Sequence, residues 1–145
     1  MKKLVIVPTY NELENMKMLL PALMGLGEAF DVLVCDDSSP DGTSDFVQKY
    51  AESEPRVHLL KRKEKNGLGK AYIAGFKWGL EKKYDAMVEM DADFSHSPTD
   101  LLKILKEAYN SKDIQPGSYP YSVIKNILFY FSGPMHYTPT AITFV

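Results

Sequence analysis

Short apolar runs alternate with longer amphipathic segments along the first 110 residues of the chain. A short run of consecutive apolar residues, bounded by turn-forming residues, is typical of a strand that is buried on both faces. Apolar residues that recur at intervals of three and four instead predict a helix with one buried face. The pattern predicts strands over residues 4–7, 31–35, 57–60 and 86–90, and helices over residues 12–26, 44–53, 70–81 and 98–109.

Two of the predicted helices carry signals at their start or in their interior. Asn11 is expected to cap the helix over 12–26 through its side chain. Pro21 lies inside that helix and should kink or split it, because proline cannot donate a backbone hydrogen bond. Ser97 is expected to cap the helix that begins at Pro98.

The alternation of predicted strands and helices argues for an α/β fold, with a mostly parallel sheet and helices on both faces. Ligands of such sheets bind in the crevice beyond the carboxyl ends of the strands. A segment rich in polar or turn-forming residues follows each predicted strand. These segments are 8–12, 36–43, the loop near Asn66, and 91–96. We therefore expect one ligand site to which all four segments contribute.

The periodic pattern ends near residue 110. Residues 115–121 are typical of irregular chain, 123–131 fit either a helix or a strand, and 141–145 fit a short edge strand. A length of 145 residues suits one domain. Within it we separate a ligand-binding part, 1–110, from an atypical tail, 111–145.

Composition excludes several classes of protein. The net charge is −2, without the basic excess that is typical of nucleic-acid binding. Cys35 is the only cysteine, which excludes an intramolecular disulfide and argues for a reducing compartment such as the cytoplasm. The apolar run at the N-terminus ends at Pro8, too soon for a signal peptide. No segment has the roughly 20 apolar residues of a membrane-spanning helix, which leaves peripheral association with the cytoplasmic face of a membrane open.

The sequence Asp91-Ala92-Asp93 directly follows the last predicted strand. On an extended backbone, alternate side chains point to the same side, so both carboxylates can reach one divalent cation. Mg²⁺ or Mn²⁺ takes one or two protein carboxylates and completes its shell with water and substrate phosphates. Asp91 and Asp93 are therefore the candidate metal-binding and catalytic pair. The alternative is a solvated turn after a strand.

Two other segments carry candidate ligand contacts. Tyr10 and Glu12, after the first strand, have the chemistry to stack on a base and to hydrogen-bond a ribose or base edge. The alternative is a capped turn into a helix. Asp37, after the second strand, suits a hydrogen bond to a ribose or a base. The alternative there is an Asx turn, which is the role expected of Asp41.

The third loop contains Gly67-Leu68-Gly69, which invites comparison with a dinucleotide-binding fingerprint. Tyr72 occupies the position of the third glycine, and the segment does not follow the first strand, so this interpretation is rejected. The loop is also basic, and its cations either attract a diphosphate or form a solvated surface. They are Arg62, Lys63, Lys65 and Lys70.

Four motifs together resemble one enzyme family. They are VPTYNE at 7–12, DDSSPDGT at 36–43, NGLGKAYIAGF at 66–76 and MDADFSHSP at 90–98. Their order and spacing resemble the family 2 glycosyltransferases of the GT-A fold. Within that family they resemble the dolichol-phosphate mannosyltransferase group, also called polyprenol-phosphate glycosyltransferases. The resemblance covers about residues 3–109 and implies a Rossmann-like GT-A sheet.

The resemblance also implies roles for individual residues. It implies that Asp91 and Asp93 bind the divalent cation, and that Asp37, with the backbone of Cys35, contacts the base or ribose. Further nucleotide contacts are implied for Pro8, Tyr10 and Glu12, and diphosphate and sugar contacts for Ala92 and Ser95. The implied reaction transfers mannose or glucose, with inversion, from a donor of the GDP-mannose or UDP-glucose type to a polyprenyl phosphate.

The acceptor decides how much further chemistry the site needs. A lipid phosphate is already anionic and requires no strong general base, whereas a glycan hydroxyl needs one, for which Asp93 and His96 are candidates. The chain departs from the family where Gly117-Ser118 is followed by Tyr119 instead of arginine, and no arginine occurs after Arg62. We therefore expect the fold to be incomplete on its C-terminal side. A nucleotide-sugar-binding fragment without transferase activity is the alternative to an enzyme.

Overall fold

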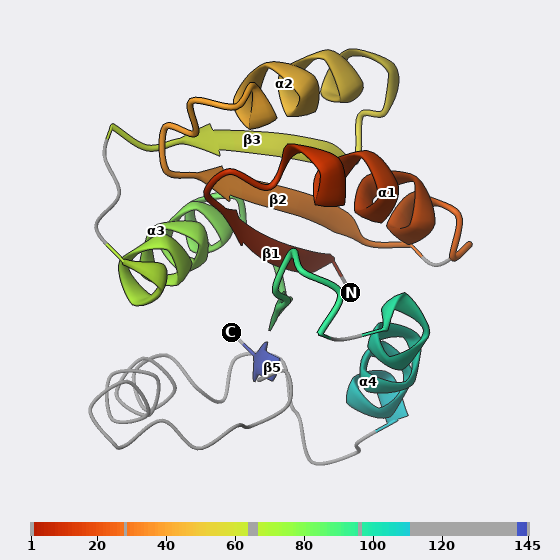
Figure 1. Ribbon diagram of the computed structural model, residues 1–145. Helices are drawn as coiled ribbons and strands as arrows, with labels where there is room; N and C mark the ends of the chain where they lie inside the picture. The colour runs from red at the N-terminus through yellow and green to blue at the C-terminus, as the bar shows by residue number, and fades with distance from the viewer. Residues whose placement is uncertain (1, 28, 64–66, 96, 111–141, 145) are drawn as a thin grey trace.

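Five strands form one sheet in the order β3-β2-β1-β4-β5 (Figure 1). The computed structural model describes residues 2–27, 29–63, 67–95, 97–110 and 142–144. Four strands are parallel, and β5 is antiparallel to β4. The predicted parallel strands and the predicted edge strand are confirmed. The strands are β1 (Lys3–Thr9), β2 (Asp31–Asp36), β3 (Val57–Lys61), β4 (Ala86–Glu89) and β5 (Ile142–Phe144).

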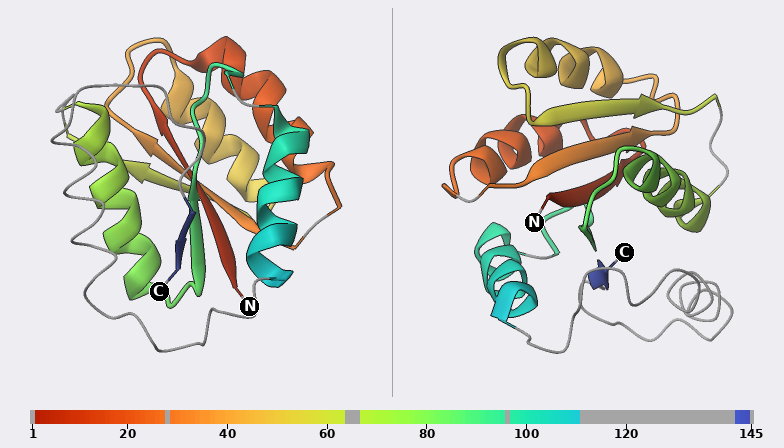
Figure 2. Two further views of the ribbon diagram at one scale, coloured as in Figure 1. Left: turned by 90° about the horizontal axis from the view of Figure 1, so that it is seen from below. Right: turned by 180° about the vertical axis from the view of Figure 1, so that it is seen from behind.

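Helices cover both faces of the sheet, with α3 on one face and α1, α2 and α4 on the other (Figure 2). Successive residues of a strand point to opposite faces. In β1, Leu4 and Ile6 pack beneath α3, whereas Val5 and Val7 pack beneath the other helices. Burial on both faces explains the continuous apolar runs, and the predicted α/β class is confirmed. The helices are α1 (Leu13–Met24), α2 (Thr43–Ser53), α3 (Leu68–Glu81) and α4 (Pro98–Asn110).

The start of α1 is capped from a different loop than predicted. Asn11 has a left-handed backbone, with a φ of 58°. Oδ2 of Asp41 accepts the Leu13 N–H at 3.1 Å, and Oγ1 of Thr43 accepts the Glu12 N–H at 3.2 Å. The prediction that Asn11 caps the helix is wrong, because the loop after β2 already supplies the acceptors. These bonds tie the loops after β1 and β2 together.

Two further predictions about helices had opposite outcomes. Pro21 is expected to kink or split α1, and the structure shows one helix from Leu13 to Met24, so the split is wrong. Pro21 lies on the exposed side of the helix, where water can satisfy the carbonyl that loses its partner. The predicted start of α4 is confirmed, because Pro98 is its first residue and Oγ of Ser97 accepts the Thr99 N–H at 3.2 Å.

The described residues leave part of the sequence predictions untested. The segments 115–121 and 123–131 lie outside them, as does most of the tail over 111–145. Within the part of the chain that the structure describes, no helix combines the length and apolarity needed to cross a membrane.

Helix α3 approaches the sheet closely at two glycines. A Cβ atom at Gly75 would lie 2.5 Å from Cγ2 of Ile6, and one at Gly79 would lie 2.4 Å from Sδ of Met87. Both distances are well inside van der Waals contact, so the separation of helix and sheet depends on glycine at both positions. The distance of α3 from the strands is therefore set by the helix backbone packing directly on side chains of the strands.

Replacement of Gly79 by alanine is expected to lower the free energy of unfolding by about 1–3 kcal/mol, because it overpacks a filled core. Higher helix propensity acts in the opposite direction, by up to about 1 kcal/mol. Urea denaturation measures the net change. Addition of Met87→Ala, which removes the clashing sulfur, should make the double variant more stable than the sum of the two single changes. A gain in stability from Gly79→Ala alone would contradict the close approach.

Candidate active site

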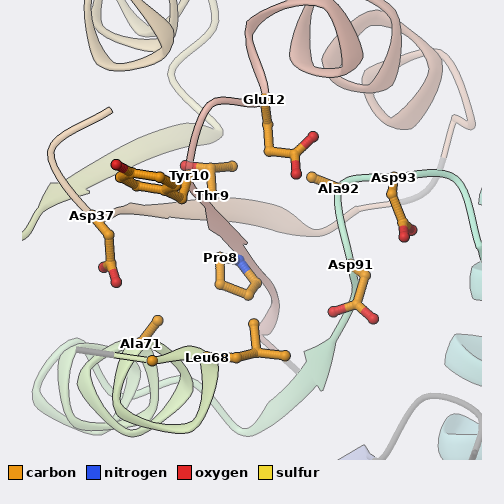
Figure 3. A pocket seen from close by; sticks show the side chains of 11 residues that line it. Pro8, Thr9, Tyr10, Glu12, Asp37, Leu68, Ala71, Asp91, Ala92 and Asp93 are labelled. Atoms are coloured by element: carbon orange, nitrogen blue, oxygen red, sulfur yellow. The ribbon is translucent and has the colours of Figure 1, made fainter. Parts of the chain in front are cut away.

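A pocket of about 330 Å³ lies at the carboxyl edge of the sheet (Figure 3). The strand order changes direction there, because β2 and β3 extend from one side of β1 and β4 lies on its other side. Ligands of open α/β sheets bind at such a switch point. The lining residues come from the end of β1, from the loops after β1, β2 and β4, and from the start of α3. They are Pro8, Thr9, Tyr10, Glu12, Asp37, Gly67, Leu68, Ala71, Asp91, Ala92 and Asp93.

The structure brings most of the predicted site residues to this one pocket. Their segments are far apart in the chain, and the parallel sheet places its strand ends at a common edge. The predicted residues therefore lie close enough together to contact one ligand. The predicted residues that line the pocket are Pro8, Tyr10, Glu12, Asp37, Asp91, Ala92 and Asp93.

Cys35 and Ser95 are the predicted site residues outside the pocket lining. Cys35 packs in the apolar cluster beneath α3, where burial raises the pKa of its thiol to about 12 and keeps it neutral. Ser95 donates its N–H to Oδ1 of Asp93 at 2.9 Å, and its hydroxyl donates to the same oxygen. Ser95 therefore holds a carboxylate of the pocket. His96, the other candidate base, lies outside the described residues.

Asp91 and Asp93 reach the same pocket through a turn. The strand β4 ends at Glu89, before either acid, and Phe94 after them has a left-handed backbone with a φ of 61°. The prediction of an extended backbone at the two acids is therefore wrong. Both carboxylates nevertheless line the pocket, and Figure 3 shows them on the same segment, across the pocket from Asp37.

Negative charge accumulates on the β4 side of the pocket. Burial and the nearby charge of Asp91 raise the pKa of Glu89 to about 7. Asp93 adds a further carboxylate to the pocket wall. A cation beside these groups would offset a repulsion that otherwise favours protonation. The electrostatics of this side of the pocket therefore fit a bound divalent cation.

The set of carboxylates fits a cation that is shared with a substrate. Within the described ranges of the chain, no group of three His, Cys, Asp or Glu side chains is placed to hold a metal ion. A structural zinc site takes four protein ligands, and calcium takes six to eight oxygens. Asp91 and Asp93 instead suit Mg²⁺ or Mn²⁺ completed by water and phosphate oxygens.

Asp36 organises the loops beside the pocket, and the sequence analysis did not identify it. Its carboxylate is fully buried. It accepts the Thr9 hydroxyl at 2.9 Å, the Ser39 N–H at 3.0 Å and the Ser44 hydroxyl at 2.5 Å. These donors belong to β1, to the loop after β2 and to the first turn of α2. One buried acid therefore joins three elements next to Asp37.

Asp37 lines the pocket while it is paired with Arg62. Nη1 of Arg62 lies 2.6 Å from Oδ1 of Asp37, and the two side chains are only 13% and 6% exposed. The Arg62 N–H also donates to the carbonyl of Asp36 at 2.7 Å. The interpretation of Arg62 as part of a solvated basic surface is therefore wrong. Because its charge is offset, Asp37 suits a hydrogen-bond acceptor better than a metal ligand.

Comparison with known proteins identifies the family to which the chain belongs. The family profile described as Glycosyl transferase family 2 matches residues 4–137. Since that span is most of the chain, the chain belongs to glycosyl transferase family 2. The resemblance stated from the four motifs is confirmed.

Two curated relatives specify the comparison further. Undecaprenyl-phosphate mannosyltransferase of Micrococcus luteus is 52% identical over 118 residues, which are 81% of this chain and 48% of that protein. Polyprenol monophosphomannose synthase of Mycolicibacterium smegmatis is 44% identical over 81% of this chain and 44% of its own length. The chain thus spans less than half the length of these relatives.

A solved structure supports the assignment of the fold. The mannosyltransferase PcManGT from Pyrobaculum calidifontis, in complex with GDP-Man and Mn²⁺, superimposes with a TM-score of 0.62 and 27% sequence identity. The match covers 72% of this chain and 31% of that chain. The predicted GT-A class of α/β fold is confirmed.

Proposed function

We propose that this chain is the donor-binding part of a metal-dependent, inverting transferase that moves mannose from GDP-mannose to a polyprenyl phosphate. The observation that carries the proposal is the convergence of Asp37, Asp91 and Asp93 on one pocket at the switch point of the sheet. The names of the two relatives support mannose and a polyprenyl phosphate. The ligands of PcManGT support GDP-mannose and Mn²⁺ over a UDP-glucose type of donor.

The nucleoside end of the donor is assigned to the β1 and β2 side of the pocket. Tyr10 presents a partly exposed ring, which suits stacking on guanine. Asp37 suits accepting hydrogen bonds from the ribose or the base. Pro8 and Glu12 complete this side of the pocket. The buried pair with Arg62 holds the Asp37 carboxylate in place before the donor arrives.

The diphosphate end is assigned to the β4 side. Asp91 and Asp93 hold the cation there, and that ion, when bound, offsets the charge that grows on the departing diphosphate. Ala92 lines the pocket between the two acids, where its small side chain leaves room for the phosphates and the sugar. Ser95 contributes by holding Asp93.

The transfer balances without a proton acceptor from the protein. A phosphate oxygen of the lipid forms a bond to the anomeric carbon while the bond from that carbon to the diphosphate oxygen breaks. GDP leaves with the electron pair, and attack from the opposite side inverts the configuration. Because the attacking oxygen is already anionic, no strong base is needed. A lipid acceptor assigns the reaction to a membrane surface, which we place at the cytoplasmic face.

Binding of the donor without transfer is the second candidate function. It is favoured by the absence of arginine after Arg62 in the sequence, since arginine is well suited to hold an acceptor phosphate. A transferase that acts on a glycan hydroxyl would keep the same donor site and require a base such as Asp93.

Isothermal titration calorimetry of the chain with GDP-mannose tests the donor assignment. Binding should require Mn²⁺ or Mg²⁺ and disappear with EDTA, and UDP-glucose should bind at least about tenfold more weakly, a difference of about 1.4 kcal/mol. Equal binding of GDP-mannose with and without EDTA would contradict the role of the metal. Preference for UDP-glucose would contradict the assigned donor.

Product analysis separates the candidate functions. The chain is incubated with GDP-mannose, Mn²⁺ and either undecaprenyl phosphate or an oligosaccharide acceptor. Formation of a mannosyl phospholipid supports the proposed enzyme, and a lengthened oligosaccharide supports the glycan transferase. Donor binding without either product supports a donor-binding unit.

A further inference from the structure

We infer that Tyr72 is a positioning residue for Asp91, whose carboxylate it holds in the orientation needed to bind a cation together with a diphosphate. The inference rests on the proposed metal role of Asp91. The Tyr72 hydroxyl donates a hydrogen bond to Oδ1 of Asp91 at 2.7 Å. Tyr72 takes the place of the third glycine of a dinucleotide-binding fingerprint, and its contact with Asp91 gives this tyrosine a functional role.

Tyr72 can fix the carboxylate because its own ring is fixed. The residue is 4% exposed and packs in the cluster beneath α3 with Ile6, Phe76 and Met87. Gly75, three residues further along α3, allows the helix to approach the sheet closely at Ile6. The position of the hydroxyl is therefore set by close packing of the helix backbone on strand side chains such as Ile6. Because the Tyr72 ring is held in this way, its hydroxyl orients the Asp91 carboxylate.

The hydroxyl acts as a donor in the conditions under which the site works. The proton of this hydrogen bond belongs to Tyr72, because an ionised carboxylate oxygen can only accept and a phenol keeps its proton at neutral pH. A hydrogen bond to an ionised carboxylate is shorter and stronger than a neutral one. A carboxylate has two oxygens with about four acceptor positions. The hydrogen bond to Oδ1 therefore leaves other acceptor positions of the Asp91 carboxylate available to bind a cation.

Asp91 and Asp93 accept hydrogen bonds from donors in two different parts of the chain. Tyr72 reaches Asp91 from α3, and Ser95 donates to Asp93 within the loop after β4. Carboxylates that bind metals are usually hydrogen-bonded themselves, which orients them before the metal arrives. Tyr72 is the more informative of the two donors to test. Phenylalanine at position 72 removes only the hydroxyl, whereas Ser95 also donates through its backbone N–H, which an alanine substitution leaves in place.

The test is Tyr72→Phe in the full chain, with Mn²⁺ affinity measured by the electron paramagnetic resonance signal of free Mn²⁺ at saturating GDP. The dissociation constant for Mn²⁺ should rise by about 10–100-fold, the usual effect of losing a hydrogen bond to a metal ligand. The affinity for GDP measured in EDTA should not change, because Tyr72 is not part of the pocket lining. This pair of measurements separates a role in metal binding from general damage to the pocket.

Tyr84→Phe is the matched control. Tyr84 is 3% exposed and donates its hydroxyl to the carboxylate of Asp31, at the opposite end of the sheet from the pocket. The Tyr84→Phe variant also loses one tyrosine hydroxyl. The affinity of this variant for Mn²⁺ should stay within about twofold of that of the unmodified chain, because the two sites are distant and independent. Equal weakening in both tyrosine variants, or an unchanged affinity in Tyr72→Phe, would overturn the inference. Absence of Mn²⁺ binding by the unmodified chain with GDP would instead overturn the proposed function.

Discussion

Asp91→Asn is expected to weaken Mn²⁺-dependent binding of GDP-mannose by about 30-fold or more. The substitution keeps the shape of the side chain, and the amide oxygen of Asn can still accept the hydroxyl of Tyr72. It removes the negative charge that the cation requires. Loss of one partner of a closely paired charge costs about 2–5 kcal/mol, which corresponds to a loss of affinity of about 30-fold or more. Isothermal titration calorimetry in Mn²⁺ and in EDTA measures the change.

Asp45→Asn provides the control for this prediction. Asp45 is exposed in the first turn of α2 and does not line the pocket. The Asp45→Asn variant also exchanges a carboxylate for an amide, so it measures how much the loss of one negative charge elsewhere in the domain affects donor binding. Donor binding by this variant should match that of the unmodified chain. An unchanged metal-dependent affinity for GDP-mannose in Asp91→Asn would show that the cation uses other residues.

The sheet and the location of the site could be predicted because they depend on local sequence patterns. The run Leu4 to Val7 is apolar throughout because its residues alternate between two buried clusters, one beneath α3 and one beneath the other helices. A parallel sheet then places the ends of its strands at one edge. Polar residues after the first, second and fourth strands therefore had to lie near one another, as Tyr10, Asp37 and Asp91 do.

The hydrogen bonds between distant segments could not be predicted in the same way. Tyr72 and Asp91 meet only because α3 lies at a particular distance from the sheet and β4 lies beside β1. Asp41 caps α1 across two loops, a contact that no local pattern encodes. A partial signal did exist for Asp36, which directly extends an apolar strand. An acid in that position is expected to find buried donors, although the sequence does not say which ones.

The turn at Asp91-Ala92-Asp93 shows a second limit of the sequence pattern. Alternation along a strand predicts that two acids one residue apart share a side, yet β4 ends before the first of them. The left-handed backbone at Phe94 belongs to the turn that follows them. The chain therefore places both carboxylates in the pocket by loop geometry, which depends on contacts such as those of Tyr72 and Ser95. Spacing alone was not sufficient to predict that geometry.

Asp36→Ala is expected to produce the largest loss of stability among these substitutions, about 3–5 kcal/mol. The carboxylate is fully buried and accepts hydrogen bonds from Thr9, Ser39 and Ser44. Alanine leaves the buried hydroxyls of Thr9 and Ser44 and the half-buried N–H of Ser39 without this acceptor, and each unsatisfied group costs about 1–3 kcal/mol, less where water enters the cavity. A loss of this size is a large fraction of the 5–15 kcal/mol that stabilises a typical domain. Urea denaturation followed by circular dichroism measures it.

Two companion variants make the prediction specific to the buried network. Asp36→Asn keeps an acceptor oxygen and should lose less stability than alanine, because Thr9 and the Ser39 N–H can still be satisfied in part. Asp45→Ala removes an exposed acid near the same loop, and surface changes of this kind are usually within about 0.5 kcal/mol. Similar losses for Asp36→Ala and Asp45→Ala would show that the network contributes little. Because the network lies next to Asp37, Asp36→Asn should also weaken GDP binding in EDTA, where the cation makes no contribution.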